Sequence, residues 1–125
     1  MGAAAEAAAA AYLQSLGWTI LARNIRVGQD ELDIIALDPR PRETVVVVEV
    51  RSRSGRRYGQ AVESVDARKV ARLYRATMRL RRAGHGALDI DRLGAPRWRV
   101  DLVTLGRTSG GAWSVESHLC GLVPP

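Results

Sequence analysis

Apolar and polar residues follow one another in a pattern that predicts two helices and a set of short strands. The alanine-rich start favours a helix over Ala3–Leu16, because alanine is the best helix former, and Gly17 can end it in a left-handed conformation. A second helix is expected where apolar residues recur at helical spacing. It runs from a capping residue, Ser64 or Asp66, to about Ala83.

Other segments have the period-two alternation, or the continuous apolar run, of a β-strand. These segments are Trp18–Arg23, Glu31–Leu37, Thr44–Ser52, Arg97–Leu105 and Ala112–Leu119. Asn24–Gln29 is expected to be a loop, and two prolines mark a further connection at Asp38–Glu43. The order of helix, three strands, helix and two strands predicts a mixed α/β fold with one central sheet flanked by helices. The whole chain, residues 1–125, is expected to form a single domain.

Two acidic residues stand where buried strands are expected. Val45–Val48 is apolar on both faces, which is typical of a central strand covered on both sides, yet Glu49 follows directly. Asp33 has a similar setting, directly before Ile34 and another isoleucine. Carboxylates in such positions need a physical reason to be there, because acidic side chains are almost never buried without a partner.

The expected hairpin register places the two acids together. If the hairpin is symmetric about Pro41, then Asp33 faces Glu49. Glu31 then faces Arg51, and all of these side chains point to one face because they alternate with period two. Directly opposed residues have Cβ atoms roughly 4.5–5.5 Å apart, so the two carboxylates call for a cation, and hard oxygen ligands suit Mg²⁺ or Mn²⁺. The alternative is that both acids are strand-end charges paired with arginines of the sheet.

The second helix carries a row of arginines on one face. They are spaced alternately four and three residues apart, so on a helix they form one stripe opposite the apolar face. Arginine binds phosphate through its planar fork, which suits a nucleic-acid backbone; the alternative is a solvated face in an arginine-rich chain. A loop before the helix adds basic residues and an aromatic ring for stacking. The candidate nucleic-acid-binding residues are Arg53, Arg56, Arg57, Tyr58, Arg68, Arg72, Arg75, Arg79 and Arg82.

Charge and composition support a polyanionic partner. The formal net charge is +6, but 18 of the 19 cationic residues are arginine and only Lys69 is lysine, which is partly a compositional bias. No segment approaches the roughly 20 apolar residues of a membrane span, and Glu6 interrupts the apolar start, so a cytoplasmic protein is expected. The single Cys120 excludes an internal disulfide and a cysteine-based metal cluster. His85 and His118 stand alone and are interpreted as structural or surface residues.

A series of short motifs runs in order through most of the chain. The motifs are Glu6, Tyr12-Leu13, Gly17-Trp18, Arg23-Asn24-Ile25-Arg26, Glu31-Leu32-Asp33-Ile34-Ile35, Val48-Glu49-Val50-Arg51-Ser52-Arg53, Tyr58-Gly59, Ala61-Val62, Lys69 and Arg97-Trp98-Arg99-Val100-Asp101. The series resembles uncharacterised protein family 0102, the YraN family, small bacterial proteins that are predicted relatives of restriction endonucleases and archaeal Holliday junction resolvases. The resemblance implies a restriction-endonuclease-like core in which Asp33 and Glu49 are metal ligands and Glu6 completes the site. Asp101 is interpreted as a structural partner for an arginine.

One departure from the family pattern concerns catalysis. Arg51 stands where the family has its signature lysine, and arginine cannot act as a base, although it can stabilise charge on a phosphorane-like transition state. Lys69 can reach the site from the second helix, or it is a solvated helix lysine. The main hypothesis is a Mg²⁺- or Mn²⁺-dependent endonuclease acting on DNA, including branched or junction DNA, whose metal is held by Asp33, Glu49 and the carbonyl of Val50. The rivals are a non-catalytic nucleic-acid-binding protein on a nuclease scaffold and an assembly module, such as a homodimer, that pairs through an exposed sheet edge.

Overall fold

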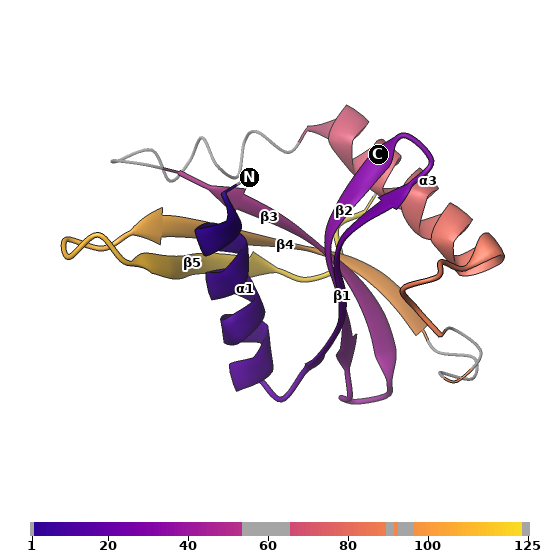
Figure 1. Ribbon diagram of the computed structural model, residues 1–125, viewed down its shortest axis with the longest axis horizontal. Coiled ribbons are helices and arrows are strands. Elements are labelled where there is room, and N and C mark those ends of the chain that lie inside the picture. The colour runs from indigo at the N-terminus through magenta and orange to yellow at the C-terminus, as the bar shows by residue number, and fades with distance from the viewer. Residues whose placement is uncertain (1, 54–65, 90–91, 93–96, 124–125) are drawn as a thin grey trace.

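The computed structural model describes residues 2–53, 66–89, 92 and 97–123, and its helices and strands follow one another in the expected order (Figure 1). The two helices begin and end close to the predicted residues, and Asp66 is the cap of the second, accepting a hydrogen bond of 3.0 Å from the Lys69 amide. The elements are α1 (Ala3–Ser15), β1 (Thr19–Val27), β2 (Asp30–Asp38), β3 (Thr44–Ser52), α3 (Ala67–Ala83), β4 (Arg97–Arg107) and β5 (Trp113–Leu119).

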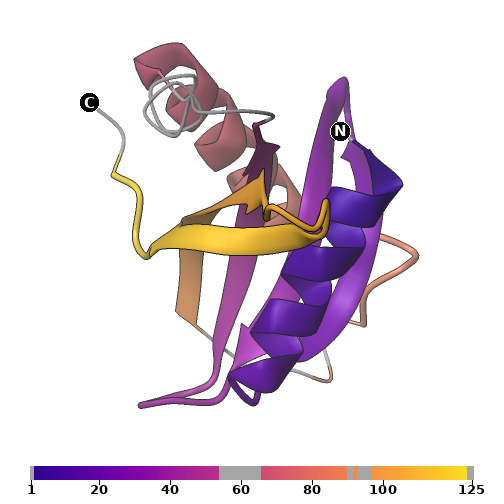
Figure 2. The same ribbon diagram turned by 90° about the vertical axis from the view of Figure 1, so that its left-hand side faces the viewer.

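The strands form one mixed sheet in the order β1-β2-β3-β4-β5. Neighbouring strands are antiparallel except β3 and β4, which are parallel and therefore joined by a crossover that contains α3. Figures 1 and 2 show α1 and α3 on opposite sides of the twisted sheet. This arrangement confirms the mixed α/β prediction and matches the restriction-endonuclease-like core that the resemblance implied. No helix in the described ranges is long and apolar enough to cross a membrane.

Strand β3 is the centre of the core, as its valine run predicted. Val46 and Val48 face α1, where they meet Leu13, whereas Val45 and Val47 face α3. All four valines are fully buried, because a helix covers each face of the sheet at this strand. Glu49, which follows the run within β3, is therefore held at the edge of a packed interior.

The predicted hairpin register between β2 and β3 is confirmed over its paired length. Leu37 pairs with Val45, and the antiparallel ladder continues to Ile34 and Val48. It ends there, one position before the predicted pairing of Asp33 with Glu49.

The predicted loop over Asn24–Gln29 is wrong, because β1 continues to Val27. Asn24 has a positive φ of 53°, which lets the strand bend without ending. Asparagine is one of the few residues that adopt this left-handed conformation readily. After the bend, Ile25 and Val27 are buried in the cluster that packs on α3. The turn to β2 is then short and includes Gly28, whose φ is 63°.

Candidate metal centre and nucleic-acid interface

The candidate site forms where β2 separates from β3. Beyond the last pair of the ladder, the next free amide on β3 belongs to Val50, and it donates a hydrogen bond of 2.8 Å to Oδ2 of Asp33. The Asp33 carboxylate thus takes the place of a backbone carbonyl. The N–H and C=O of a strand residue point to the same neighbouring strand, so the carbonyl of Val50 also points toward Asp33. This is the position that the sequence predicted for a metal-binding carbonyl.

A polar pocket of about 430 Å³ opens at this separation, and we call it the acidic pocket. It brings together both predicted acids, the only lysine of the chain and one member of the arginine stripe. Its lining residues are Asn24, Gln29, Asp30, Glu31, Asp33, Glu49, Lys69 and Arg72.

Glu49 is the most enclosed acid of the pocket, with 4% of its surface exposed. Its Oε1 lies 3.5 Å from Nζ of Lys69 and 3.3 Å from Nη2 of Arg51. Burial, and then the charge of Asp33, raise the pKa of Glu49 from 4.5 to about 6, although Lys69 and Arg51 act in the opposite direction. Two cations therefore only partly offset the cost of an ionised Glu49.

The predicted partner of Arg51 is corrected by this geometry. Glu31 pairs across the ladder with Arg26 of β1, and the guanidinium of Arg51 contacts Glu49 on its own strand. The ladder has already ended at this point, so no cross-strand neighbour holds Glu31 opposite Arg51. The alternative interpretation of the acids as arginine-paired charges is thus correct for the contact between Glu49 and Arg51. Among the described residues, none accepts a hydrogen bond from the buried Nε of Arg51.

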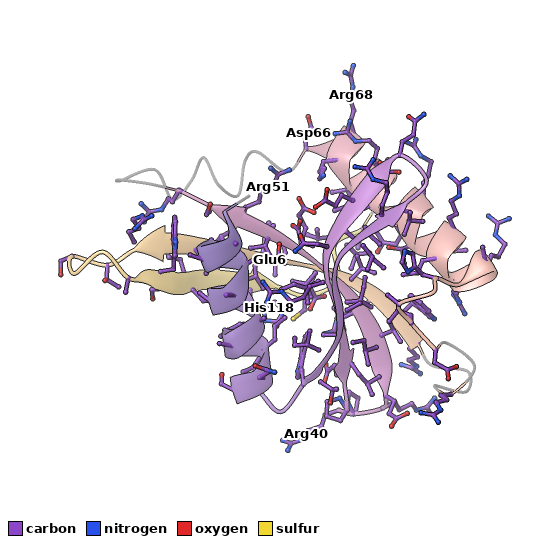
Figure 3. The ribbon with its side chains drawn as sticks, viewed as in Figure 1. Glu6, Arg40, Arg51, Asp66, Arg68 and His118 are labelled. Carbon is purple, nitrogen blue, oxygen red and sulfur yellow. The ribbon has the colours of Figure 1, made fainter. Side chains whose placement is uncertain are left out.

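Asp33 and Glu6 belong to the same electrostatic group. Burial raises the pKa of Asp33, the Val50 amide lowers it, and the charge of Glu6 raises it again. Glu6 itself is 3% exposed, and its Oε1 accepts hydrogen bonds from Nε of Arg23 at 3.0 Å and Nδ2 of Asn24 at 2.8 Å. The first turn of α1 therefore delivers a third carboxylate within electrostatic reach of Asp33, and Figure 3 shows Glu6 and Arg51 near this part of the sheet.

Asn24 is a site residue that the sequence analysis missed. It lies in β1 between the residues that pair with Ile34 and Leu32, so it faces Asp33 across the strands. It also lines the acidic pocket while its amide holds Glu6. The signal that could have found it is the residue type, because asparagine tolerates the left-handed backbone that turns its side chain toward α1.

The arginine stripe lies as predicted. All five arginines on this face of α3 are exposed, while the opposite face buries Val70, Leu73, Thr77 and Leu80. The stripe begins near the acidic pocket, which Arg72 lines. The five members are Arg68, Arg72, Arg75, Arg79 and Arg82.

Arg53 is the one described basic candidate that does not lie on α3. Arg53 forms a double contact with Glu116 of β5, one hydrogen bond of which joins Nε to Oε2 at 2.9 Å. No local pattern predicts this pairing, since 63 positions separate the two residues. Arg56, Arg57 and Tyr58 lie outside the described residues.

A second polar cluster surrounds Asp101, which is fully buried in β4. Arg99 donates to both carboxylate oxygens at 2.8 and 3.1 Å, confirming the predicted arginine partner, and Nε2 of His118 and the Gly121 amide contact them at 2.8 and 3.0 Å. Burial alone would raise the pKa of Asp101, but the hydrogen bonds from His118, Arg99 and Gly121 lower it. Nδ1 of His118 lies 2.9 Å from the hydroxyl of Tyr12, so the cluster joins α1, β4 and β5.

Fold and site together define a small mixed α/β protein with a restriction-endonuclease-like core and an acidic pocket where β2 separates from the central strand. The model of uncharacterised protein family UPF0102 matches residues 5–105, and the chain belongs to this family.

Several UPF0102 proteins are similar over most of the chain. That of Sorangium cellulosum is 39% identical over 116 residues, which is 93% of this chain and 76% of the relative. That of Mycobacterium tuberculosis is 42% identical over 127 residues, covering 98% of this chain and 91% of the relative. That of Deinococcus radiodurans is 48% identical over 77 residues, covering 62% of this chain and 61% of the relative.

One solved structure, of Pyrococcus furiosus SfsA in complex with Ca²⁺, aligns with 90% of this chain and 59% of its own. Its TM-score is 0.30 and its sequence identity is 15%, a similarity too low to support an inference about this chain.

Proposed function

We propose that this protein is a divalent-metal-dependent endonuclease that hydrolyses phosphodiester bonds of DNA, including branched or junction DNA. The observation that carries the proposal is the meeting of Asp33 and Glu49 in one polar pocket at the foot of an exposed arginine stripe. Acidic ligands beside a basic surface are what a metal-dependent phosphodiesterase requires, since the metal and the arginines both act on phosphate.

The donors of the acidic pocket fit Mg²⁺ or Mn²⁺. Asp33, Glu49 and the carbonyl of Val50 offer hard oxygen atoms, and Glu6 lies close enough to act electrostatically on Asp33. The raised pKa values of Asp33 and Glu49 indicate a group of acids whose charge is not fully compensated by the protein. When bound, a divalent ion would lower the pKa of a coordinated water and polarise the scissile phosphate.

Lys69 is the residue to which we assign the role of the family's signature lysine. Its ammonium group approaches Glu49 from α3, whereas the position on β3 next to the acid is occupied by Arg51. Lys69 can donate to the attacking water or to a phosphate oxygen as a compact point charge. A guanidinium group cannot act as a base, so Arg51 can only stabilise negative charge on the phosphate.

A cleavage assay with Mn²⁺ on linear, single-stranded and four-way-junction DNA tests this function. We expect cleavage of at least one substrate by the wild-type protein and none by Asp33→Asn, with DNA binding retained in the variant. Cleavage by Asp33→Asn at the wild-type rate would show that the activity comes from elsewhere. No cleavage of any substrate by the wild-type protein would contradict the proposed function.

A non-catalytic nucleic-acid-binding protein is the second candidate. The contacts of Lys69 and Arg51 with Glu49 favour it, because two protein cations already stand where a metal would compensate the acid. Melting in increasing Mn²⁺ separates the candidates, since a ligand stabilises the folded state by RT ln(1 + [L]/Kd). A rise in melting temperature that Asp33→Asn abolishes supports the metal centre. No rise at millimolar Mn²⁺ rejects the enzyme and favours the binding protein.

A further inference from the structure

A second groove runs along the exposed side of α3, beside the β1–β2 turn, and has a volume of about 790 Å³. We call it the α3 groove. It combines basic and apolar groups, since three exposed arginines of the stripe stand around Met78, which is 45% exposed, and the ring of Tyr74. Its principal lining residues are Asp30, Tyr74, Arg75, Met78, Arg79 and Arg82.

The groove has one helical wall and one wall from the sheet. On the sheet side, the guanidinium of Arg79 lies against the β1–β2 turn so closely that a Cβ on Gly28 would stand 2.2 Å from Nη1. On the helical side, the hydroxyl of Tyr74 donates a hydrogen bond to the carbonyl of Leu122, which fixes the ring. One cationic and one aromatic group of the groove, Arg79 and Tyr74, are therefore held by contacts outside it.

The α3 groove and the acidic pocket adjoin each other. Asp30 lines both of them, and a small pocket between them is lined by Asp30, Arg72 and Ala76, among others. The sign of the charge changes along this path, from the carboxylates of Asp33 and Glu49 to the guanidinium groups of the stripe. A nucleic acid that lies in both places would present phosphate directly to the arginines, and to the acidic pocket only through a cation that the carboxylates hold.

We propose that the α3 groove binds unpaired nucleotides of the same strand that enters the acidic pocket. Phosphates would contact Arg75, Arg79 and Arg82, and a base would lie on the apolar surface of Met78 and Tyr74. Bases of a duplex are stacked on one another and offer no free face, so a groove with an apolar floor and a cationic rim favours single strands. The inference rests on the proposed function for its claim that the same strand continues into the acidic pocket. Binding in the α3 groove itself needs no metal.

Fluorescence anisotropy in EDTA tests the groove separately from catalysis. The probes are a labelled DNA strand of about ten nucleotides, an RNA of the same sequence and a blunt DNA duplex. A strand of this length lies within the range of known single-strand site sizes. The test variant is Arg75→Gln/Arg79→Gln. The matched control is Arg40→Gln/Arg42→Gln, which removes the same charge from exposed residues of the β2–β3 turn; Figure 3 shows Arg40 at the end of the molecule opposite Arg68 of α3.

We expect the wild-type protein to bind a single strand more tightly than the duplex, and the relative affinities for DNA and RNA identify the natural strand. Arg75→Gln/Arg79→Gln should weaken this binding by about tenfold or more and reduce the slope of log K against log salt by roughly 1.4, the value for two phosphate contacts on a single strand. Met78→Gln should reduce the preference for single strands without changing that slope.

Two results would overturn the inference. Equal losses in the test and control variants would mean that only net charge matters, and duplex binding as tight as single-strand binding would exclude the base contact. The endonuclease proposal can fail independently of the groove. Single-strand binding that depends on Arg75 and Arg79, without cleavage of any substrate in Mn²⁺, would retain the groove and reject the endonuclease. Cleavage that is unchanged in Arg75→Gln/Arg79→Gln, with unchanged affinity, would retain the endonuclease and reject the groove.

Discussion

The carboxylate of Asp33 accepts a hydrogen bond from the backbone amide of Val50 at 2.8 Å, so a side chain on β2 completes the hydrogen bonding of β3. This contact fixes one acid of the pocket to the strand that carries the other. It occurs one step beyond the end of the ladder, where a backbone partner is no longer available to Val50.

Substitutions of Asp33 should separate the hydrogen bond from the charge. In Asp33→Asn the side-chain oxygen can still accept from the Val50 amide, so we expect a stable protein. In Asp33→Ala the buried amide loses its acceptor, which costs about 1–3 kcal/mol. Urea denaturation of both variants checks this order. Equal stability of the two would mean that the Val50 amide finds another acceptor.

Glu49 should make stability depend on pH. Its pKa is raised from 4.5 to about 6 in the folded state, chiefly by burial and then by Asp33, so folding favours the protonated form. The contribution of Glu49 to the free energy of unfolding is therefore fully present below pH 4.5 and is lost as the pH rises through about 6. The loss amounts to about 2 kcal/mol.

Glu49→Gln removes this dependence because the amide does not titrate. Its stability relative to the wild-type protein should increase by about 2 kcal/mol as the pH rises from 4.5 to well above 6. Chemical denaturation across this range measures the difference, with Glu43→Gln at an exposed position as the control. A constant difference between Glu49→Gln and wild type would contradict the assignment.

Lys69 should be measurable through its effect on Glu49. Its charge lowers the pKa of Glu49 across a 3.5 Å contact, so Lys69→Met should raise that pKa further above 6. The carboxyl carbon of Glu49 in an NMR titration reports the change directly. Arg68→Met removes the same charge from the exposed position before Lys69 and is the matched control. The same displacement in both variants would argue against a specific contact.

The cluster around Asp101 should be structural. Asp101→Asn removes the charge that holds Arg99 and His118 in a buried setting, and breaking such a pair costs about 3–5 kcal/mol. Asp89→Asn removes an exposed ion pair with Arg92 and should leave stability almost unchanged. Thermal melting compares the two variants. An equally mild effect of both would show that the Asp101 cluster does not hold α1, β4 and β5 together.

The framework of this fold follows from local patterns. The valine run of β3 predicts a doubly covered strand, and symmetry about Pro41 predicts its register with β2, because period-two side chains and a short turn leave few alternatives. The same register brings Asp33 and Glu49 to one pocket. Asp66 as a cap and Gly84 as a terminator bound the second helix for equally local reasons.

The partners of the charged side chains could not be predicted in the same way. Arg51 contacts Glu49 instead of Glu31 because the ladder ends before it reaches them. Lys69 reaches the pocket because the crossover after β3 places α3 over this end of the sheet, a tertiary effect that no spacing encodes. The sequence predicts a loop at Asn24, because an asparagine that bends a strand cannot be distinguished by residue type from one in a turn.

The parallel pairing of β3 with β4 also decides which elements hold the acidic pocket together. Asp33 and Glu49 belong to a hairpin whose strands are joined by a short turn, whereas Lys69 lies on the longer crossover that the parallel pairing requires. The two acids and the ammonium group that partly neutralises them therefore belong to different units of the fold. Local opening of the crossover would leave the two carboxylates together on the hairpin without the charge of Lys69.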